Sequence, residues 1–329
     1  MADMGSRLIQ KQQGFTLITV MLIVALIAMI TGGLLYQQGV QVKRSGYLLH
    51  QSQAMAVALG LEKWVKKGLL LDAQAGTVDH LNEQWAQPLP PVPFAGGQIS
   101  GHLQDLDGRL NLNNLALQDA DLRTKWRSVI QRFFAQQWQQ PQMALVLEDW
   151  VDADSEVTLL AGEMGAESDV YLLKRPPYRA ANQPMVTVSE LQALSGSSPM
   201  KVAKIKDWVD TLPTPTKVNV NTAPEAVLLA FAEDLDVEWI QNWLAYRKTQ
   251  PAQQTADFRN FMKEQSGQTD EVINQIWRDE LITVQSQYFR LEGFLQYGEV
   301  TQYLAGLFYR PNKEQVFLLQ RWQLPAEQE

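Results

Sequence analysis

The hydrophobic pattern begins with one long uncharged segment near the N-terminus. Residues 15–36 are apolar apart from scattered threonine and glycine and a terminal tyrosine, and the next charge is Lys43. About 20 apolar residues suffice for a helix to cross a bilayer. Two cations, Arg7 and Lys11, precede the segment, which indicates a cytoplasmic N-terminus and an outward-facing remainder. We therefore expect a single transmembrane helix over residues 15–36.

A removable signal peptide is the alternative for this segment. Signal peptides have an apolar core of roughly 7–15 residues, followed by small residues at the cleavage site. Here the apolar run is longer, and Ile30-Thr31-Gly32 is a poor match to such a site. The pattern favours an anchor that stays in the membrane.

Helical periodicity continues beyond the anchor. The predicted apolar face of this second helical stretch consists of Ala54, Val57, Leu61 and Trp64. Lys66 and Lys67 followed by Gly68 are typical of a helix C-terminus, so we expect the helix to end there. Any single-pass protein with a juxtamembrane helix would also show this pattern.

Strand signals occupy two separate parts of the chain. Four prolines break the chain into a loop at residues 88–93, and Asp107-Gly108 within the alternating residues 97–113 predicts a hairpin. Near the C-terminus, three runs rich in aromatic and aliphatic residues predict strands at 288–295, 302–310 and 315–322.

The stretch between these strands has helical rather than alternating periodicity. One helical face contains Trp126, Ile130, Phe133 and Phe134, and another contains Ile240, Trp243, Leu244 and Arg247. The pattern predicts an α+β fold in which a long N-terminal helix accompanies an antiparallel sheet, with a large all-α domain inserted into the sheet sequence.

Composition and the absence of known motifs exclude several classes of function. The formal net charge is −8 at pH 7, which disfavours binding to a phosphate backbone. The chain has no cysteine, which excludes disulfides, thiolate metal sites and a cysteine nucleophile. Its histidines, His50, His80 and His102, share no motif, and no metalloprotease, nucleophile-elbow or P-loop pattern occurs. We therefore predict a non-enzymatic protein.

Carboxylates are dense in one cation-free stretch, residues 133–173. They are Glu148, Asp149, Asp152, Asp154, Glu156, Glu163, Glu167 and Asp169. Like charges at this density raise one another's pKa or unfold the segment, and a divalent cation relieves both effects. The spacing Asp152-x-Asp154-x-Glu156 lets alternate side chains of an extended loop converge on one ion, and all-oxygen ligands suit calcium. A solvated acidic face is the competing interpretation.

Two resemblances give these patterns a context. Gly14-Phe15-Thr16-Leu17-Ile18 resembles the type IV prepilin processing motif, which implies cleavage between Gly14 and Phe15 by a prepilin peptidase and N-methylation of Phe15. Thr19 stands where pilins have a glutamate that is thought to pair with the N-terminal amine of a neighbouring subunit. A subunit with nothing above it needs no such partner, so Thr19 indicates a terminal subunit.

The second resemblance covers nearly the whole chain after the leader. It is carried by motifs in this order: "DLDGRLNLNNL" (105–115), "DWVDADSE" (149–156), "GAESDVY" (165–171), "PYRAANQPMVTVSEL" (177–191) and "VNVNTAPEAVL" (218–228). Together they resemble the K-type minor pseudopilin family (GspK) of the bacterial type II secretion system. That family implies a type IV pilin-like fold interrupted by an α-domain.

The family resemblance implies a division of the chain, an ion and partners. The expected parts are a leader (1–14), the transmembrane helix (15–36), a first pilin part (37–115), the inserted α-domain (116–285) and a second pilin part (286–329). The implied ligands for one or two Ca²⁺ ions are Asp152, Asp154, Glu156, Glu167 and Asp169, with Asp149 as an additional candidate that could instead cap a helix. Ser168 stands where some relatives are expected to have another acid.

The implied place of the protein is the tip of the periplasmic pseudopilus. We expect a single-pass inner-membrane protein with its C-terminal domain in the periplasm. The implied partners are the minor pseudopilins I and J, possibly H, together with the inner-membrane assembly platform and the prepilin peptidase. No nucleic acid is expected as a partner.

Two other functions remain open from the sequence. "VNVNTAPEAVLLAF" followed by "WIQNWLAYRK" resembles a helix-hairpin-helix module, so a membrane-tethered DNA-binding protein is one alternative. However, the turn "AEDLDVEW" has no glycine and four acids, which cannot build the amide site for a phosphate. The other alternative is a tethered periplasmic hydrolase that uses a metal in the acidic block.

Overall fold

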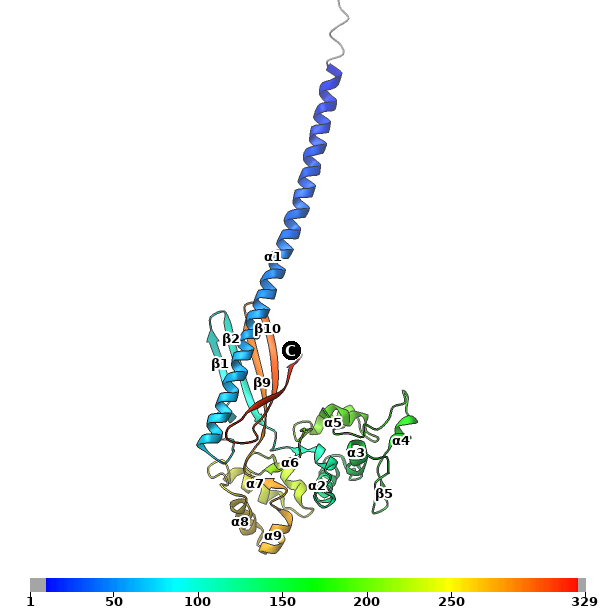
Figure 1. Cartoon of the computed structure of the whole chain (residues 1–329), viewed down its shortest axis with the longest axis vertical. Coiled ribbons are helices and arrows are strands. Elements are labelled where there is room, and N and C mark those ends of the chain that lie inside the picture. The colour runs from blue at the N-terminus through cyan, green and yellow to red at the C-terminus, as the bar shows by residue number, and fades with distance from the viewer. Residues whose placement is uncertain (1–9, 325–329) are drawn as a thin grey trace, which may run out of the picture.

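The computed structural model of the protein describes residues 10–324. It consists of one long N-terminal helix and a folded part that packs on the C-terminal half of this helix. Helix α1 (Gln10–Ala75) is 66 residues long and projects from the folded part as a rod (Figure 1). Its most apolar 18-residue window has a mean hydropathy of 2.6 and is not buried at all. Within the described residues, α1 alone is long and apolar enough to cross a membrane. Residues 1–9 of the predicted leader lie outside the described residues.

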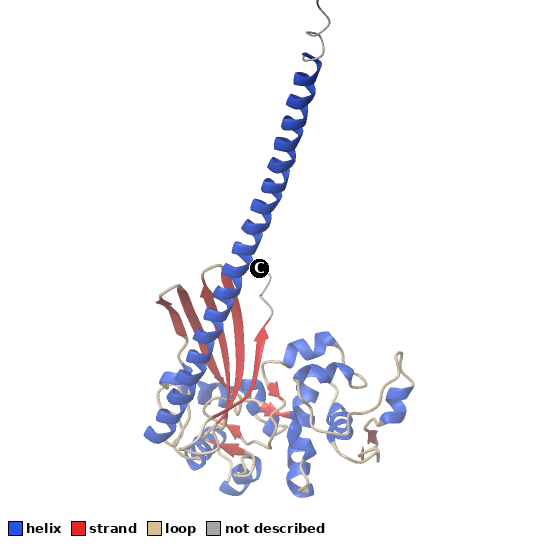
Figure 2. Ribbon diagram, turned by 45° about the horizontal axis from the view of Figure 1, so that its top comes forward, coloured by secondary structure: helices blue, strands red, loops and turns tan. Residues whose placement is uncertain are grey.

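The C-terminal half of α1 lies along one face of an antiparallel sheet (Figures 1 and 2). The sheet has the order β1-β2-β9-β10-β11. Its strands are β1 (Leu89–Phe94), β2 (Gly97–Asp105), β9 (Tyr288–Tyr297), β10 (Val300–Tyr309) and β11 (Phe317–Leu324). The predictions of three C-terminal strands and of a long helix with an antiparallel sheet are therefore confirmed.

The helix meets the sheet through a stripe that differs slightly from the predicted one. The buried apolar residues in the described part of α1 are Ala54, Ala58, Leu61, Val65 and Leu69, which pack on strand residues such as Phe289 and Leu291. Trp64 was expected on this face, but its side chain is 61% exposed. The helix also continues past Gly68 to Ala75, because Leu69 is needed in the core and its packing outweighs the local C-cap signal.

Two predictions about the first strands are wrong. The proline-rich segment expected to be a loop is the edge strand β1. Proline has no N–H to donate, and an edge strand tolerates this because it has a neighbouring strand on one side only. The turn of this hairpin is at Ala95-Gly96, where Gly96 has a φ of 101°. Asp107-Gly108 forms no hairpin. Instead, Gly108 lies so close to Thr222 that a Cβ would come within 2.7 Å of its hydroxyl.

The segment between β2 and β9 forms a helical region that lies beside and beyond the end of the sheet (Figures 1 and 2). Its helices are α2 (Ala120–Trp138), α3 (Met143–Val151), α4 (Ser168–Leu172), α5 (Pro199–Ile205), α6 (Glu225–Leu228), α7 (Val237–Tyr246), α8 (Thr255–Ser266) and α9 (Asp270–Ile276). Both predicted helical faces are found, in α2 and α7. Its core contains Trp126, Phe133, Trp243, Phe258 and Trp277, all at most 1% exposed.

Short strand pairs hold this region together. Two parallel pairs, β3 (Leu110–Asn111) with β6 (Val209–Asp210) and β7 (Val218–Asn219) with β8 (Ile282–Thr283), join its early and late segments. A small antiparallel hairpin, β4 (Leu159–Leu160) with β5 (Glu163–Met164), lies far from the sheet.

Candidate metal centre

The acidic block starts on α3, where one carboxylate is already neutralised. Glu148 is 2% exposed, and both of its oxygens accept hydrogen bonds from the Arg127 guanidinium of α2. The Nε of Arg123 lies 3.2 Å from the same carboxylate. Glu148 therefore belongs to the packing of α2 against α3 and has no need of a metal.

The next acids are brought together by the β4–β5 hairpin. Its turn residues Ala161 and Gly162 both have positive φ, at 52° and 86°, as a tight two-residue hairpin turn requires. The hairpin reverses the chain, so the segment that follows α3 returns beside the segment that leads into α4. Asp152 ends α3 as its C-cap and Glu167 precedes α4 as its N-cap, so both carboxylates sit at fixed helix ends.

Three of the predicted ligands share one site. One carboxylate oxygen from each of Asp152, Asp154 and Glu167 lies within 4.8 Å of the other two. Oxygens on opposite sides of a calcium ion, with bonds of about 2.4 Å, are about this far apart. The three residues thus offer the oxygens that a hard cation requires. The sequence spacing alone places Asp152 and Asp154 together, whereas Glu167 is brought to them by the fold.

The electrostatics of this group favour the binding of a cation. Burial, together with the neighbouring carboxylates of Asp154, Asp149 and Glu167, raises the pKa of Asp152 to about 7. Burial also raises the pKa of Glu167. Asp152 Oδ1 and Glu167 Oε1 are shielded from solvent and have no hydrogen-bond partner within residues 10–324. Buried carboxylate oxygens without partners are costly, and a bound cation would satisfy both.

The other predicted ligands lie outside this group. Glu156 and Asp169 are exposed, and the backbone N–H of Glu156 donates to Asp154 Oδ1 at 2.9 Å. Asp149 is fully buried within α3, so it is not a helix N-cap. Its Oδ1 accepts a hydrogen bond from the Thr158 N–H at 3.0 Å and so ties the hairpin to α3. Burial raises the pKa of Asp149. Ligation by Glu156, Asp169 and Asp149 stays a prediction.

Asn182 is a candidate that the sequence reasoning missed. Its amide nitrogen donates to the Asp154 carbonyl oxygen, which places the side chain beside the ligand loop. Its Oδ1 is shielded from solvent, and the described part of the chain offers it no donor. Asn182 also has a φ of 46°, a conformation that asparagine tolerates better than most residues. Asn182 lies within the motif "PYRAANQP", which could have indicated it as a ligand, but a search for charged ligands does not select an uncharged amide.

The N-terminal residues of the processing motif lie within α1. The Thr19 hydroxyl donates to the Phe15 carbonyl oxygen, one turn earlier, at 2.9 Å. Thr19 therefore satisfies its own hydroxyl within the helix, whereas a glutamate at this depth would need a partner.

The helix-hairpin-helix resemblance leads to an acidic surface. The four acids of residues 232–239 are all exposed, and Asp236 caps α7 by accepting a hydrogen bond from the Glu238 N–H at 2.8 Å. Neither Asn221 nor Thr222 caps α6: the Asn221 side chain bonds the backbone of Ala252, and the Thr222 hydroxyl donates to Asp105. Exposed carboxylates at this turn repel phosphate.

Comparisons with known proteins agree with the resemblance drawn from the motifs. Two family models of the type II secretion system protein K match residues 108–214 and 218–276. The chain is 31% identical to type II secretion system protein K of Pseudomonas aeruginosa over 94% of this chain and 92% of that protein. It is 27% identical to the protein K of Aeromonas hydrophila, over 97% and 99% of the two chains.

A solved structure supports the fold. It is that of the GspK–GspI–GspJ complex from enterotoxigenic Escherichia coli, which matches with a TM-score of 0.72 at 22% identity and covers 86% of this chain and 100% of that one. The matches from sequence run through the acidic loops and the helical region as well as the pilin-like part. The chain belongs to the type II secretion system protein K (GspK) family.

Proposed function

We propose that this protein is a minor pseudopilin that initiates and caps the periplasmic pseudopilus from its tip. Its family is structural and non-enzymatic, and the chain accordingly acts by assembly. The observation that carries the proposal is the helical region, which projects sideways from the end of the sheet (Figure 1). A thin fibre with one subunit per step has no room for this volume at every step, whereas a terminal subunit can hold it. The Thr19 hydroxyl, which donates to the Phe15 carbonyl oxygen of the same helix and so needs no neighbouring subunit, also supports a place at the tip.

The proposed architecture follows the division expected from the sequence. Residues 15–36 anchor the protein in the inner membrane, 37–115 and 286–329 form the pilin core, and 116–285 form the α-domain in the periplasm. The I- and J-type pseudopilins are the proposed direct partners, because the solved relative was obtained with GspI and GspJ. The assembly platform, the H-type pseudopilin and the prepilin peptidase are further proposed partners.

Position in the fibre is the direct test. In cells that lack the endogenous protein and overproduce pseudopili, the epitope-tagged chain should label one end of each fibre and should co-purify with the I and J pseudopilins. The matched control is a tagged major pseudopilin, which should label the whole length. Labelling of this chain along the whole fibre would contradict the tip assignment.

The acidic centre has a proposed structural role in this assembly. We propose that Asp152, Asp154 and Glu167 bind Ca²⁺, with Asn182, Glu156, Asp169 and Asp149 as further candidates, and that one or two ions hold the loops between α3 and α4. The orphaned oxygens of Asp152 and Glu167 support this role. The alternatives of DNA binding and metal-dependent hydrolysis have no comparable support.

Calcium should therefore raise the melting temperature of the purified chain. A ligand that binds only the folded state adds about 2.7 kcal/mol at a concentration a hundredfold above its dissociation constant. We expect this increase over chelator to be smaller in Asp152→Asn and unchanged in Glu233→Gln, which alters an exposed acid outside the centre. Calorimetry with calcium or EDTA measures it, and equal melting temperatures for the wild type would rule out a structural calcium ion.

A further inference from the structure

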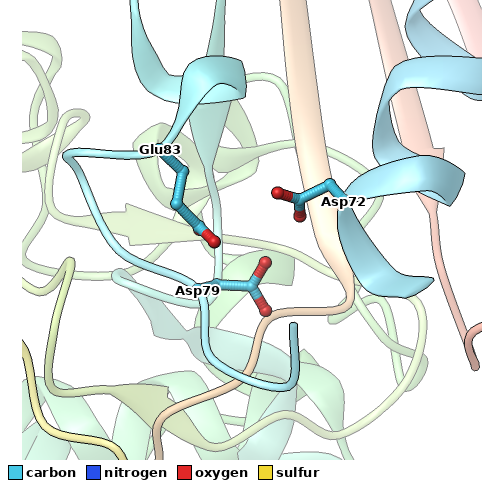
Figure 3. A group of neighbouring side chains, drawn as sticks. All are labelled: Asp72, Asp79 and Glu83. Atoms are coloured by element: carbon cyan, nitrogen blue, oxygen red, sulfur yellow. The ribbon is translucent and has the colours of Figure 1, made fainter. Parts of the chain in front are cut away.

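A second carboxylate cluster lies where the end of α1 meets the sheet and the helical region. Asp72 is on the last turns of α1, and Asp79 and Glu83 are in the loop that follows. Figure 3 shows the three side chains pointing toward one another. One oxygen from each lies within 4.8 Å of the other two. Asp72 and Asp79 line a cavity of about 350 Å³. This junction cluster is separate from the centre between α3 and α4.

The junction cluster has too little positive charge nearby. Arg310 at the end of β10 donates to Asp72 Oδ2 at 2.9 Å and also to Asp79 Oδ1. Lys217 and Lys313 at the cavity rim are exposed, and in the described part of the chain neither forms an ion pair with these acids. One guanidinium therefore faces the three carboxylates of the cluster.

Two more buried carboxylates add to this imbalance. The Ser286 N–H donates to Asp79 Oδ2 at 2.7 Å, and the Ser286 hydroxyl donates to Asp105 Oδ2 at 2.6 Å, which brings Asp105 beside the cluster. The backbone N–H of Asp107 in turn donates to Asp105 Oδ1 at 2.8 Å. Of the five carboxylates gathered here, only Asp72 and Asp79 pair with a cation within the described residues, and that cation is Arg310.

Asp107 gives an independent indication that this cavity binds a ligand. It lines the same cavity and is 2% exposed. Its Oδ2 accepts hydrogen bonds from the Gln287 and Tyr288 N–H groups, whereas no described residue donates to its buried Oδ1. Asp105, two residues earlier, has donors for both oxygens. The unmet acceptor of Asp107 is thus specific to the residue that lines the cavity.

We propose that the junction cluster, at the edge of this cavity, binds a hard divalent cation through Asp72, Asp79 and Glu83, with the buried Asp107 oxygen on the cavity wall as an additional acceptor close by. Calcium suits the oxygen spacing and tolerates an irregular ligand set better than magnesium does. The ion would fasten the end of α1 to the loop that follows it, at the base of the helical region. This site does not depend on the proposed calcium centre between α3 and α4.

The test uses the full chain in detergent with that other centre removed by Asp152→Asn, Asp154→Asn and Glu167→Gln. We expect this background to bind one calcium ion per chain in titration calorimetry. It should also bind Tb³⁺ with emission excited through tryptophan, because Trp85 Nε1 donates to Glu83 Oε2 at 2.7 Å. Adding Glu83→Gln should weaken both by at least tenfold, and adding the exposed Glu299→Gln should change neither.

Two further variants make the outcome decisive. Trp85→Phe should remove the tryptophan-excited Tb³⁺ emission and keep calcium binding, because this residue supplies no ligand oxygen. Asp107→Asn should also weaken calcium binding, and it serves if Glu83→Gln unfolds, as judged by circular dichroism in EDTA. No calcium binding by the background, or binding unchanged by both Glu83→Gln and Asp107→Asn, would overturn the proposal. Failure at this site would leave the centre between α3 and α4 to be judged by its own variants.

Discussion

Glu148→Ala should lower the free energy of unfolding by about 3–5 kcal/mol. Glu148 is buried between α2 and α3, where it binds Arg127 through both oxygens and lies beside Arg123. Removing one partner of a buried ion pair leaves the other charge without compensation, which is far more costly than losing a surface pair. The helical region should therefore unfold at markedly lower denaturant, as measured by guanidinium titration followed by circular dichroism.

An exposed glutamate on a helix of the same region provides the control. Glu264 lies on the solvent side of α8, and Glu264→Ala should change the free energy of unfolding by no more than about 0.5 kcal/mol. A loss below about 1 kcal/mol for Glu148→Ala would show that α2 and α3 pack equally well without the pair.

Gly14→Leu should abolish maturation and reduce type II secretion to the level of the deletion strain. The processing motif implies that the peptidase cleaves after Gly14, where any side chain enlarges the residue on the N-terminal side of the cut bond. Uncut chains keep Arg7 and Lys11 ahead of the anchor. Intact-mass analysis of membrane extracts should show a chain that begins at methylated Phe15 for the wild type with peptidase, and the full chain for the variant.

A second glycine of α1, Gly39, provides the control that distinguishes a loss of cleavage from a general effect of leucine on the helix. No side chain of the described protein lies within 4 Å of a Cβ added at Gly39, so Gly39→Leu tests the same substitution in the same helix away from the motif. It should be cleaved like the wild type. A wild-type chain that begins at Met1 even with the peptidase would make the protein an ordinary anchored one.

The elements that the sequence predicted well are those whose local pattern and final packing agree. The C-terminal strands alternate because one face of β9 packs on α1, and α2 shows its helical stripe because that stripe enters the core. Asp107-Gly108 does form a turn, closed by the Arg109 N–H donating to the Leu106 carbonyl oxygen at 3.1 Å, but the strands on either side of it pair elsewhere and make no hairpin. Asp107 accepts from the amides of Gln287 and Tyr288, and Gly108 permits close approach to Thr222. These partners, Gln287, Tyr288 and Thr222, all lie more than a hundred residues away, so a local sequence pattern could not reveal them.

The candidate metal centre follows the same rule. Asp152 and Asp154 are two residues apart, so their shared site was visible in the sequence, and Glu167 came from a motif of the family. Asn182 joins them through a contact across 28 residues and carries no charge. The junction cluster could not be predicted from the sequence, because Asp72, Asp79 and Glu83 follow no ligand spacing and come together only where the loop after α1 returns beside the end of that helix.

The unbroken helix α1 fixes the rotational phase between the anchor and the folded part. Each residue of a helix turns the chain by about 100° and advances it by about 1.5 Å. One residue inserted between the membrane segment and Ala54 would therefore swing the sheet and the helical region about a quarter of the way around the helix axis. The number of residues in α1 therefore sets the direction in which the apolar segment 15–36 faces relative to the sheet and the helical region.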